Sequence, residues 1–216
     1  MDPKTNTVWL PQVMFESALI VVSILVALGL DEWRQKREDQ ELAQNSLSTF
    51  IIEIQQNRIR VEDAAPFDQG LRQVLQSHYR DDDIGSVDEF VSMVESYSPA
   101  ALQSTAWDTA LATGSLAKME YTVVTALSLT YSLQNRYARV TQTGMHDLTS
   151  PQNLSNDKLK LAVYNSIRYL DSVTTLETEL AITYSEAILV IEAAQRAMNG
   201  ESIEADTGST KDQTHP

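Results

Sequence analysis

Hydrophobic residues form one continuous run near the start of the chain. Residues 13–30 read VMFESALIVVSILVALGL and carry a single charge, at Glu16. An α-helix of about 18 residues, rising about 1.5 Å per residue, just covers a bilayer core of roughly 30 Å. We therefore predict a short N-terminal tail over 1–12 and one transmembrane helix over 13–32.

Four residues are predicted to lie at the two water interfaces of this helix: Trp9, Glu16, Trp33 and Arg34. Indole rings favour the interfacial layer of a bilayer, and two of them bracket the run. Glu16 lies within about one turn of the expected boundary, so its carboxylate can reach water. In an alternative hypothesis, Glu16 and Ser23 face another transmembrane helix and form hydrogen bonds to it.

Two other interpretations of the run are open. A secretory signal peptide would have its apolar part over 17–30, with Ala27 and Gly29 mimicking a cleavage site. A buried core helix would explain why the charge-free part is only about 14 residues long. The strongly helical sequence that follows directly disfavours a cleavage site, because cleavage sites are usually extended. The rest of the chain does not form a core large enough to surround the run, which disfavours a buried helix.

Beyond residue 32, apolar residues recur at helical spacing and almost never alternate as in a strand. The predicted fold class is therefore all-α, with one N-terminal transmembrane helix that continues into a helical bundle domain over 33–199. The first helix should end at about 63, because Pro66 is expected to break it. Further helices are predicted over 66–79, 87–97, 101–113, 116–143 and 156–198. Residues 200–216 have no apolar periodicity and are predicted to be a disordered tail.

Local signals support several of these boundaries. Ser86 and Glu89 have the spacing of a capping box, and Gly114 suits the left-handed position after a helix. Gly144 and Pro151 follow the helix predicted over 116–143 and are expected to end it. The predicted apolar face of 66–79 consists of Phe67, Leu71, Val74 and Leu75. The last helix carries an apolar stripe at spacings of three and four, typical of a bundle seam: Val163, Ile167, Leu170, Val173, Leu180, Tyr184, Ile188 and Ile191.

Composition and charge exclude several kinds of partner and site, and they predict the side of the membrane on which the helical domain lies. The chain has 216 residues and a formal net charge of -14, which argues against a basic surface that binds nucleic acid. It contains no cysteine, so disulfides, thiol catalysis and Cys-based metal sites are excluded. Arg34, Lys36 and Arg37 follow the apolar run, whereas Lys4 alone precedes it. The positive-inside rule therefore predicts a cytoplasmic helical domain, with a periplasmic domain as the alternative.

Several polar residues lie on or beside the predicted apolar faces. Glu53 and Asn57 are one turn apart and adjoin the stripe formed by Phe50 and Ile54. Polar residues of this kind could line a pocket between helices, a usual place for a ligand in a bundle. The candidate ligand-binding set is Glu53, Asn57, Trp107, Thr113, Tyr131 and Gln134, with Thr109 beside them. The simpler interpretation, which we favour, is that they are hydrogen-bonded core residues that fix the register of the helices.

The sequence carries no recognisable motif for catalysis, metal binding or a cofactor. It contains no GxSxG elbow, P-loop or GxGxxG, and neither His78 nor His146 has a partner at the spacing of a helical zinc motif. The acidic run 81–83 resembles a calcium loop, but Gly85 is misplaced for one, so a solvated turn is favoured. We predict no cofactor, no metal and no enzymatic activity.

Three segments carry a resemblance to a family: ESALIVVSILVALGLDEWR (16–34), EIQQNR (53–58) and AWDTALATGSLAKM (106–119). They are similar to segments of uncharacterised bacterial single-pass inner-membrane proteins, which have an ALxLDEWR-type membrane edge and a small helical domain. The resemblance implies a bacterial inner-membrane location. It supplies no activity, cofactor or catalytic residue.

These observations lead to two expectations for function. The first is a membrane-anchored helical scaffold or accessory subunit, whose partners are the lipid bilayer and either a second copy of the chain or another membrane protein. The alternative is a sensory bundle that binds a small ligand and acts through a separate output partner, since helix shifts can pass through a bundle joined to a membrane helix.

Overall fold

The computed structural model describes residues 9–150 and 154–200, with side chains over 15–144, at 150 and over 154–200. These residues form five α-helices and one 3₁₀ turn, and no strand occurs among them. The elements are α1 (Trp9–Asp81), α2 (Val87–Glu95), α3 (Thr105–Thr113), η1 (Ser115–Lys118), α4 (Tyr121–Thr149) and α5 (Leu159–Met198). The all-α prediction is confirmed.

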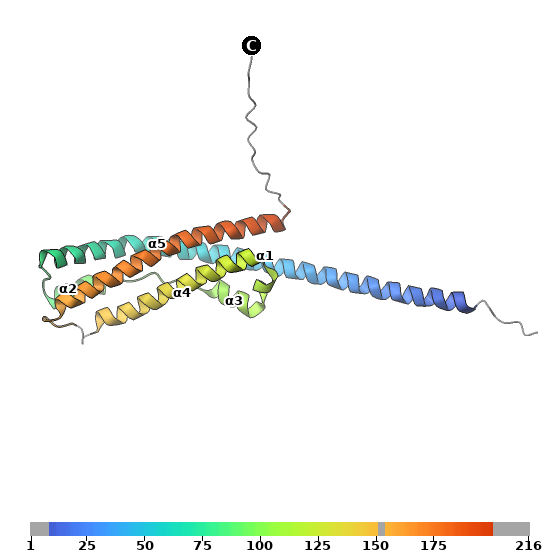
Figure 1. Ribbon diagram of the computed structural model, residues 1–216, viewed down its shortest axis with the longest axis horizontal. Coiled ribbons are helices and arrows are strands. Elements are labelled where there is room, and N and C mark those ends of the chain that lie inside the picture. The colour runs from blue at the N-terminus through green and yellow to red at the C-terminus, as the bar shows by residue number, and fades with distance from the viewer. Residues whose placement is uncertain (1–8, 151–153, 201–216) are drawn as a thin grey trace, which may run out of the picture.

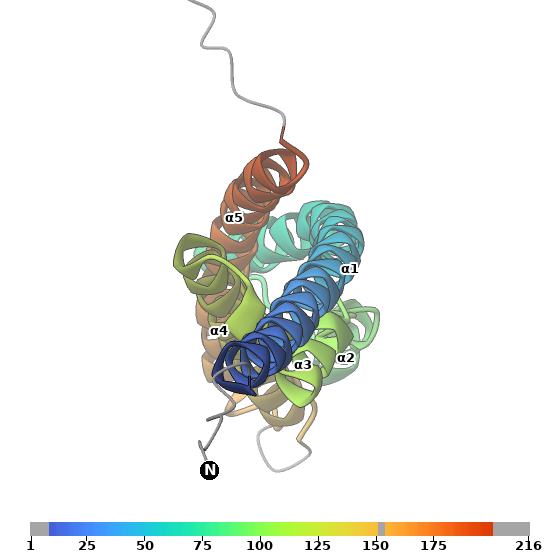
Figure 2. The same cartoon turned by 90° about the vertical axis from the view of Figure 1, so that its right-hand side faces the viewer.

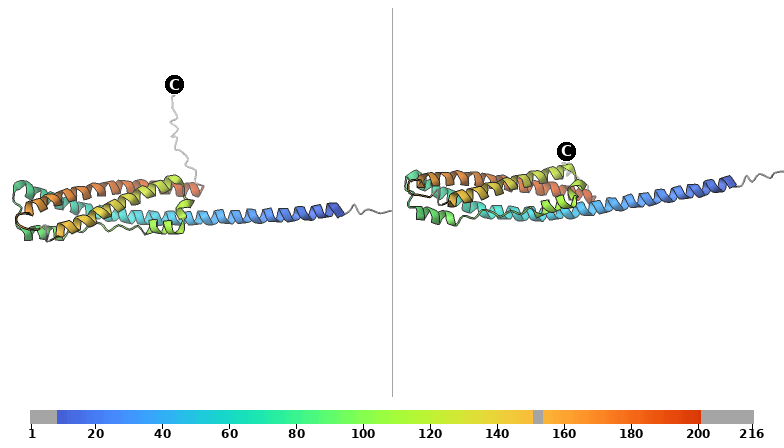
Figure 3. Two further views of the ribbon diagram at one scale, coloured as in Figure 1. Left: turned by 60° about the horizontal axis from the view of Figure 1, so that its bottom comes forward. Right: turned by 90° about the horizontal axis from the view of Figure 1, so that it is seen from below.

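Three long helices build the bundle, and α5 packs against both α1 and α4 (Figure 1). Viewed along the long axis, α1, α4 and α5 surround a common centre (Figure 2). Lys160, at the start of α5, bonds to Asp82 just after the end of α1, whereas Gln44 in the middle of α1 bonds to Asn199 just after the end of α5. The two helices are therefore antiparallel. The N-terminal part of α1 projects beyond the bundle as a single uninterrupted helix (Figure 3).

The apolar stripe predicted for the last helix forms the centre of the core. All eight of its residues are buried, and Val173, Leu180 and Tyr184 have no measurable exposure. A fully buried Leu or Ile side chain contributes roughly 1.5–3 kcal/mol relative to leaving it in water. One part of the core joins α1, α3, α4 and α5, and a second part joins α1, α2 and the start of α5. The stripe therefore connects both parts of the core.

The predicted break before Pro66 is wrong, because α1 continues through this residue to Asp81. A proline inside a helix costs about 3 kcal/mol, since it removes one backbone hydrogen bond and crowds the preceding turn. Buried contacts on both sides of the proline, at Val61 and Leu75, hold the helix against α5 and offset this cost. The uninterrupted helix also turns a different face inward, so Phe67 and Val74 are 44% and 43% exposed.

The other boundaries follow the sequence signals to different degrees. The capping box is confirmed, with the Glu89 amide donating to Ser86 Oγ and the Ser86 amide donating to Glu89 Oε2. Gly114 caps α3 in the left-handed conformation, at φ 70°. The helix predicted over 116–143 is divided into η1 and α4, and α4 runs past Gly144 to Thr149. The predicted start of α3 at 101 is four residues too early, because 101–104 is not helical.

The projecting part of α1 has its apolar side chains in solvent. Phe15 is 71% exposed and Leu25 is 62% exposed, and Glu16, Trp33 and Arg34 are exposed as well. Where side chains are described, which in α1 begins at Phe15, no helix is both long and apolar enough to cross a membrane. The first two residues of the predicted 13–32 span lie outside that part, so the span stays a prediction.

Several other N- and C-terminal predictions fall outside the described region. The side chain of Trp9, residues 1–8 and residues 201–216 are not described. The predicted interfacial role of Trp9 and the predicted disordered tail are therefore not addressed by the structure.

Gly144 of α4 lies directly against the ring of Tyr169 of α5. A Cβ atom placed on Gly144 would overlap the ring of Tyr169, whereas a Cβ on Gly70, also helical, would meet nothing within 4 Å. We predict that Gly144→Ala lowers the free energy of unfolding by about 1–3 kcal/mol, because the ring must move. The measurement is urea unfolding followed by circular dichroism.

Gly70→Ala is the matched control for this prediction. It makes the same change in an open helical position, where alanine stabilises a helix by up to about 1 kcal/mol relative to glycine. An equal or higher stability of Gly144→Ala relative to Gly70→Ala would contradict the close approach of the two helices.

Candidate functional site

The predicted polar residues Glu53 and Tyr131 lie together in the core. Glu53 is nearly fully buried and comes from α1, and its Oε1 accepts a hydrogen bond of 2.7 Å from the Tyr131 hydroxyl of α4. Its Oε2 accepts a 2.9 Å bond from the Ala106 amide, in the first turn of α3. Burial and the neighbouring Glu53 carboxylate raise the pKa of Tyr131, so this hydroxyl is a permanent donor. Glu53 thus joins α1, α3 and α4.

Asn57, one turn further along α1, binds the backbone before α3. Its Oδ1 accepts from the Gln103 amide at 2.9 Å, and its Nδ2 donates to the Gln103 carbonyl at 2.7 Å. The same Nδ2 donates to Gln134 Oε1 at 3.1 Å, and Gln134 Nε2 donates to the Gln103 carbonyl at 2.6 Å. Tyr184 of α5 donates to Gln134 Oε1 at 3.0 Å. We call the set Glu53, Asn57, Tyr131, Gln134 and Tyr184 the polar clasp.

Five of the six candidate ligand residues therefore come together, and the sixth does not. Trp107 stacks on Tyr131 with ring centroids 5.3 Å apart. Thr113 is exposed at the end of α3 and donates to the Thr109 carbonyl, away from the clasp. The polar atoms of the clasp are occupied by protein partners, so the arrangement matches the core interpretation that the sequence favoured. Its evident role is to hold the segment before α3 against the bundle.

A second polar group, a buried pair of carboxyls, was not foreseen. Asp68 of α1 has no measurable exposure and Glu177 of α5 is 2% exposed. Were both ionised, the two Asp68 oxygens and Glu177 Oε2 would have no donor among the described residues. The two carboxyls interact with each other, and a proton on one of them would let it donate a hydrogen bond to the other. Such a bond requires one proton on the pair.

Burial is the main reason that the pair keeps this proton. Desolvation raises the pKa of Asp68, and it raises the pKa of Glu177 to about 8, where the hydrogen bond to Asp68 acts in the same direction. A Tyr137 hydroxyl 3.3 Å from Glu177 Oε1 works against this rise by donating to the carboxyl. We assign the proton to Glu177, which donates to Asp68.

Tyrosines surround the acid pair. Tyr137 accepts a 3.1 Å bond from the Ala100 amide, and this links the pair to the segment before α3. Tyr97 and Tyr169 share a 3.0 Å hydrogen bond, and Tyr169 donates to the Thr141 carbonyl at 3.4 Å. Burial raises the pKa of Tyr97, Tyr137 and Tyr169. These hydroxyls therefore stay neutral and act as hydrogen-bond donors.

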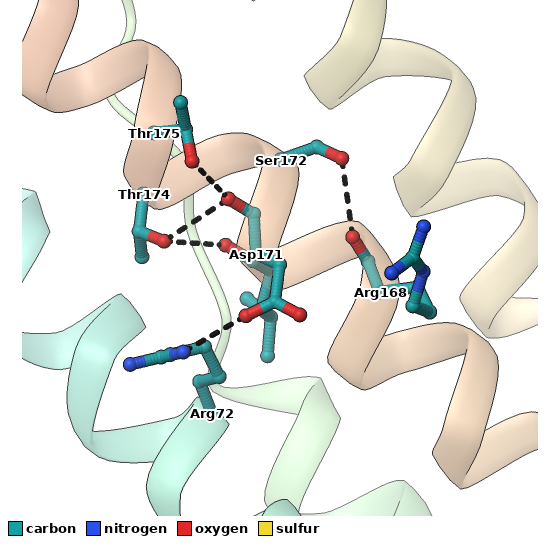
Figure 4. A network of polar contacts seen from close by, with 7 residues as sticks. Arg72, Arg168, Asp171, Ser172, Thr174 and Thr175 are labelled. Atoms are coloured by element: carbon teal, nitrogen blue, oxygen red, sulfur yellow. Dashed lines mark hydrogen bonds and ion pairs between the residues drawn. The ribbon is translucent and has the colours of Figure 1, made fainter.

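An ion pair near the acid pair also joins α1 to α5. Arg72 Nη1 lies 2.8 Å from Asp171 Oδ1, and both side chains are partly exposed (Figure 4). Thr174 and Thr175 donate to the Asp171 carbonyl on the following turn. Arg168 lies on the other side of Asp171 and extends toward α4 (Figure 4).

A cavity of about 720 Å³ lies between α4 and α5. Its volume is within the range of small-molecule sites, and its position is separate from the polar clasp. Apolar side chains from three helices and three basic side chains line it: Phe90, Val140, Leu161, Tyr169, Arg136, Arg139 and Lys158. A neighbouring depression of about 350 Å³ shares Arg136 and includes Arg168 and Asp171. No sequence motif pointed to this cavity.

The described histidines and acidic residues do not form a metal site. No group of three or more His, Cys, Asp or Glu residues there could hold a metal ion. The side chain of His146 is not described, and His78 binds the Asp83 carbonyl through Nδ1 at 2.7 Å. Asp82 of the acidic turn forms an ion pair with Lys160.

Comparison with known proteins leaves the chain without a recognised relative. No family model matches it, and no curated protein and no solved structure shows significant similarity to it. The resemblance to small bacterial inner-membrane proteins stays a prediction.

The polar clasp predicts a specific cost for removing Asn57. In Asn57→Ala the Gln103 amide loses its side-chain acceptor and the Gln103 carbonyl keeps only the bond from Gln134 Nε2. We therefore expect the free energy of unfolding to fall by about 1–3 kcal/mol. Urea unfolding measures this change. Thr113→Ala, at the exposed candidate position, is the control and should stay within about 0.5 kcal/mol of the wild type. An Asn57→Ala protein as stable as the control would show that the clasp does not hold the bundle.

The acid pair predicts that stability falls as the pH rises. The folded protein keeps the Glu177 proton up to about pH 8, whereas the usual carboxyl pKa is 4.5, so unfolding releases a proton between these values. The free energy of unfolding should therefore decrease from pH 5 to pH 8. Glu32, Asp82 and Asp157, whose pKa values are lowered, titrate below this range.

Urea unfolding at several pH values from 5 to 8 tests this dependence. Glu177→Gln should flatten the profile, because the amide does not titrate. Glu179→Gln, an exposed glutamate on the same helix, should keep the wild-type slope. An unchanged slope in Glu177→Gln would rule out the shared proton.

Proposed function

We propose that the protein is a single-pass, membrane-anchored helical domain that works by binding a neighbouring membrane protein, as a scaffold or an accessory subunit. The observation that carries the proposal is the exposure of large apolar side chains on every side of α1 near its start. They are Phe15, Leu19, Ile20, Val21, Val22, Ile24, Leu25, Val26, Leu28 and Leu30.

An apolar surface of this form needs an apolar environment. Soluble monomers rarely expose contiguous apolar patches larger than a few hundred Å². Side chains that surround a helix completely cannot all be covered by one bundle face, whereas lipid covers a helix from all sides. Ser23 donates to the Leu19 carbonyl at 2.8 Å, so its hydroxyl is satisfied within the helix. These features support a lipid-embedded anchor over 13–32.

A charged part of α1 separates the proposed anchor from the bundle. Residues 31–38 are exposed, and three pairs at spacing four connect successive turns: Glu32 with Lys36, Arg34 with Glu38, and Arg37 with Glu41. The Arg37 guanidinium also lies 5.8 Å from the centre of the Trp33 ring. The bundle begins at the ion pair between Asp39 and Lys118. This arrangement favours Trp33 and Arg34 at the water interface.

The proposal includes a location and a side of the membrane. The resemblance favours a bacterial inner membrane, and the basic residues after the anchor favour a cytoplasmic bundle. The partner is a membrane protein beside the anchor, or a second copy of the chain. The proposal contains no catalytic step, and it does not use the polar clasp as a ligand site, because protein groups occupy its polar atoms.

Membrane extraction tests the anchor. The full chain, expressed in bacteria, should remain in the membrane pellet after washing with alkaline carbonate. In Ile24→Lys/Leu25→Lys it should be released, because each lysine at the centre of a span costs about 2.5–3.5 kcal/mol. Leu129→Lys/Leu189→Lys places the same charges at exposed apolar positions of the bundle and should stay in the pellet. Release of the wild type by carbonate would refute the anchor.

The same membranes test binding and orientation. Crosslinking before mild detergent extraction should recover the chain with a membrane protein or with a second copy. A strict monomer with and without crosslinker would refute the binding function while leaving the anchor intact. Protease added to spheroplasts should spare a cytoplasmic bundle and digest a periplasmic one.

A further inference from the structure

The cavity between α4 and α5 combines two chemical features that belong to one kind of ligand. Val140, Leu161 and Tyr169 supply an apolar wall, and Arg136 and Arg139 of α4 also line the cavity. Apolar walls favour an apolar molecular body, and a volume of about 720 Å³ accommodates a molecule of several rings or a short chain. We propose that this cavity binds an organic anion with an apolar body.

Three basic residues give the lining of the cavity a positive charge. The chain has 16 Lys and Arg against 30 Asp and Glu, yet Arg136, Arg139 and Lys158 all line this cavity. Among the described residues, no carboxylate forms an ion pair with Arg136 or Arg139, whereas Arg37, Arg58 and Arg72 all have acidic partners. Two guanidinium groups that have no acidic partner among the described residues are suited to a carboxylate or phosphate, which they bind through paired N–H groups.

The packing of α4 against α5 places the apolar wall and the arginines around the same cavity. Arg136, Arg139 and Val140 lie within one turn of α4 and share a face of that helix. Leu161 and Ala162 lie in the first turn of α5, where the helix dipole favours an anion. Asn165, one turn further, supplies an uncharged polar group. An anionic group near the arginines would leave the apolar body against Val140 and Tyr169.

The position of the cavity favours a dissolved ligand over a lipid of the anchoring membrane. The neighbouring depression includes Asp171, which pairs with Arg72 of α1. Arg72 lies roughly 40 residues beyond Leu30, or ~60 Å along a helix. This step alone rests on the proposed membrane anchor. The chemistry of the cavity does not depend on the anchor, so ligand binding is expected even if carbonate extraction removes the protein from membranes.

Calorimetric titration of the full chain tests the proposal, with the protein in phosphatidylcholine nanodiscs and empty nanodiscs as the blank. The probes are 2-naphthoate, 2-naphthyl phosphate, the neutral 2-naphthamide and inorganic phosphate. We expect one site for each naphthyl anion, with the amide and inorganic phosphate at least tenfold weaker. Equal affinity of the acid and the amide, or no binding of either naphthyl anion, would overturn the proposal. Binding of inorganic phosphate as tight as naphthyl phosphate would also overturn it, because the apolar body would then contribute nothing.

Variants assign the site. Arg136→Gln/Arg139→Gln should weaken 2-naphthoate at least tenfold and leave 2-naphthamide within twofold. Arg80→Gln/Arg196→Gln removes the same two charges outside the cavity and should leave both probes within twofold. An unchanged affinity in the first variant, or an equal loss in the second, would overturn the assignment. Competition by phosphatidylglycerol added to the nanodiscs would replace the dissolved ligand by a lipid headgroup.

Discussion

The packing of α5 between α1 and α4 is the interaction on which the rest of the structure depends. Its stripe from Val163 to Ile191 is buried along the whole length of the helix and connects both parts of the core. Without this surface no packing energy would offset the cost of Pro66 inside α1. The cavity beside Leu161 would also lose one of its walls. The bundle is therefore better described as two helices arranged on α5 than as a symmetrical group of three.

Two polar layers interrupt this apolar interface, and each satisfies its buried groups differently. At the polar clasp, Glu53 keeps both oxygens occupied by the Tyr131 hydroxyl and the Ala106 amide. At the acid pair, both Asp68 oxygens and Glu177 Oε2 lack such donors, and a shared proton takes their place. Burial of a polar group without a partner is costly, so both layers specify the register of α1 against α5. The acid pair does so only while its proton is present.

Periodicity was a good guide to the parts of the fold that apolar packing decides. It predicted the whole α5 stripe and the inward position of Glu53 and Asn57, because a buried helix face leaves a regular trace in the sequence. It missed Asp68 because the expected break at Pro66 ended the stripe too soon; continuing the spacing from Val61 would have placed Asp68 on the buried face. Glu177 fills the gap between Val173 and Leu180 in the same way. The cavity could not have been predicted, since Arg136 and Leu161 meet only after α4 and α5 have packed.

The continuity of α1 has a geometrical consequence for the projecting segment. Because α1 has no hinge, the packing of its buried end also sets the rotation of its N-terminal end about the helix axis. The direction in which the Leu25 side chain points is therefore determined by the packing of Leu75. Each residue of an α-helix turns the chain by about 100°. A single residue inserted into the exposed residues 31–38 would thus leave the bundle unchanged. It would rotate the N-terminal part of the helix, so that different side chains face a given neighbour.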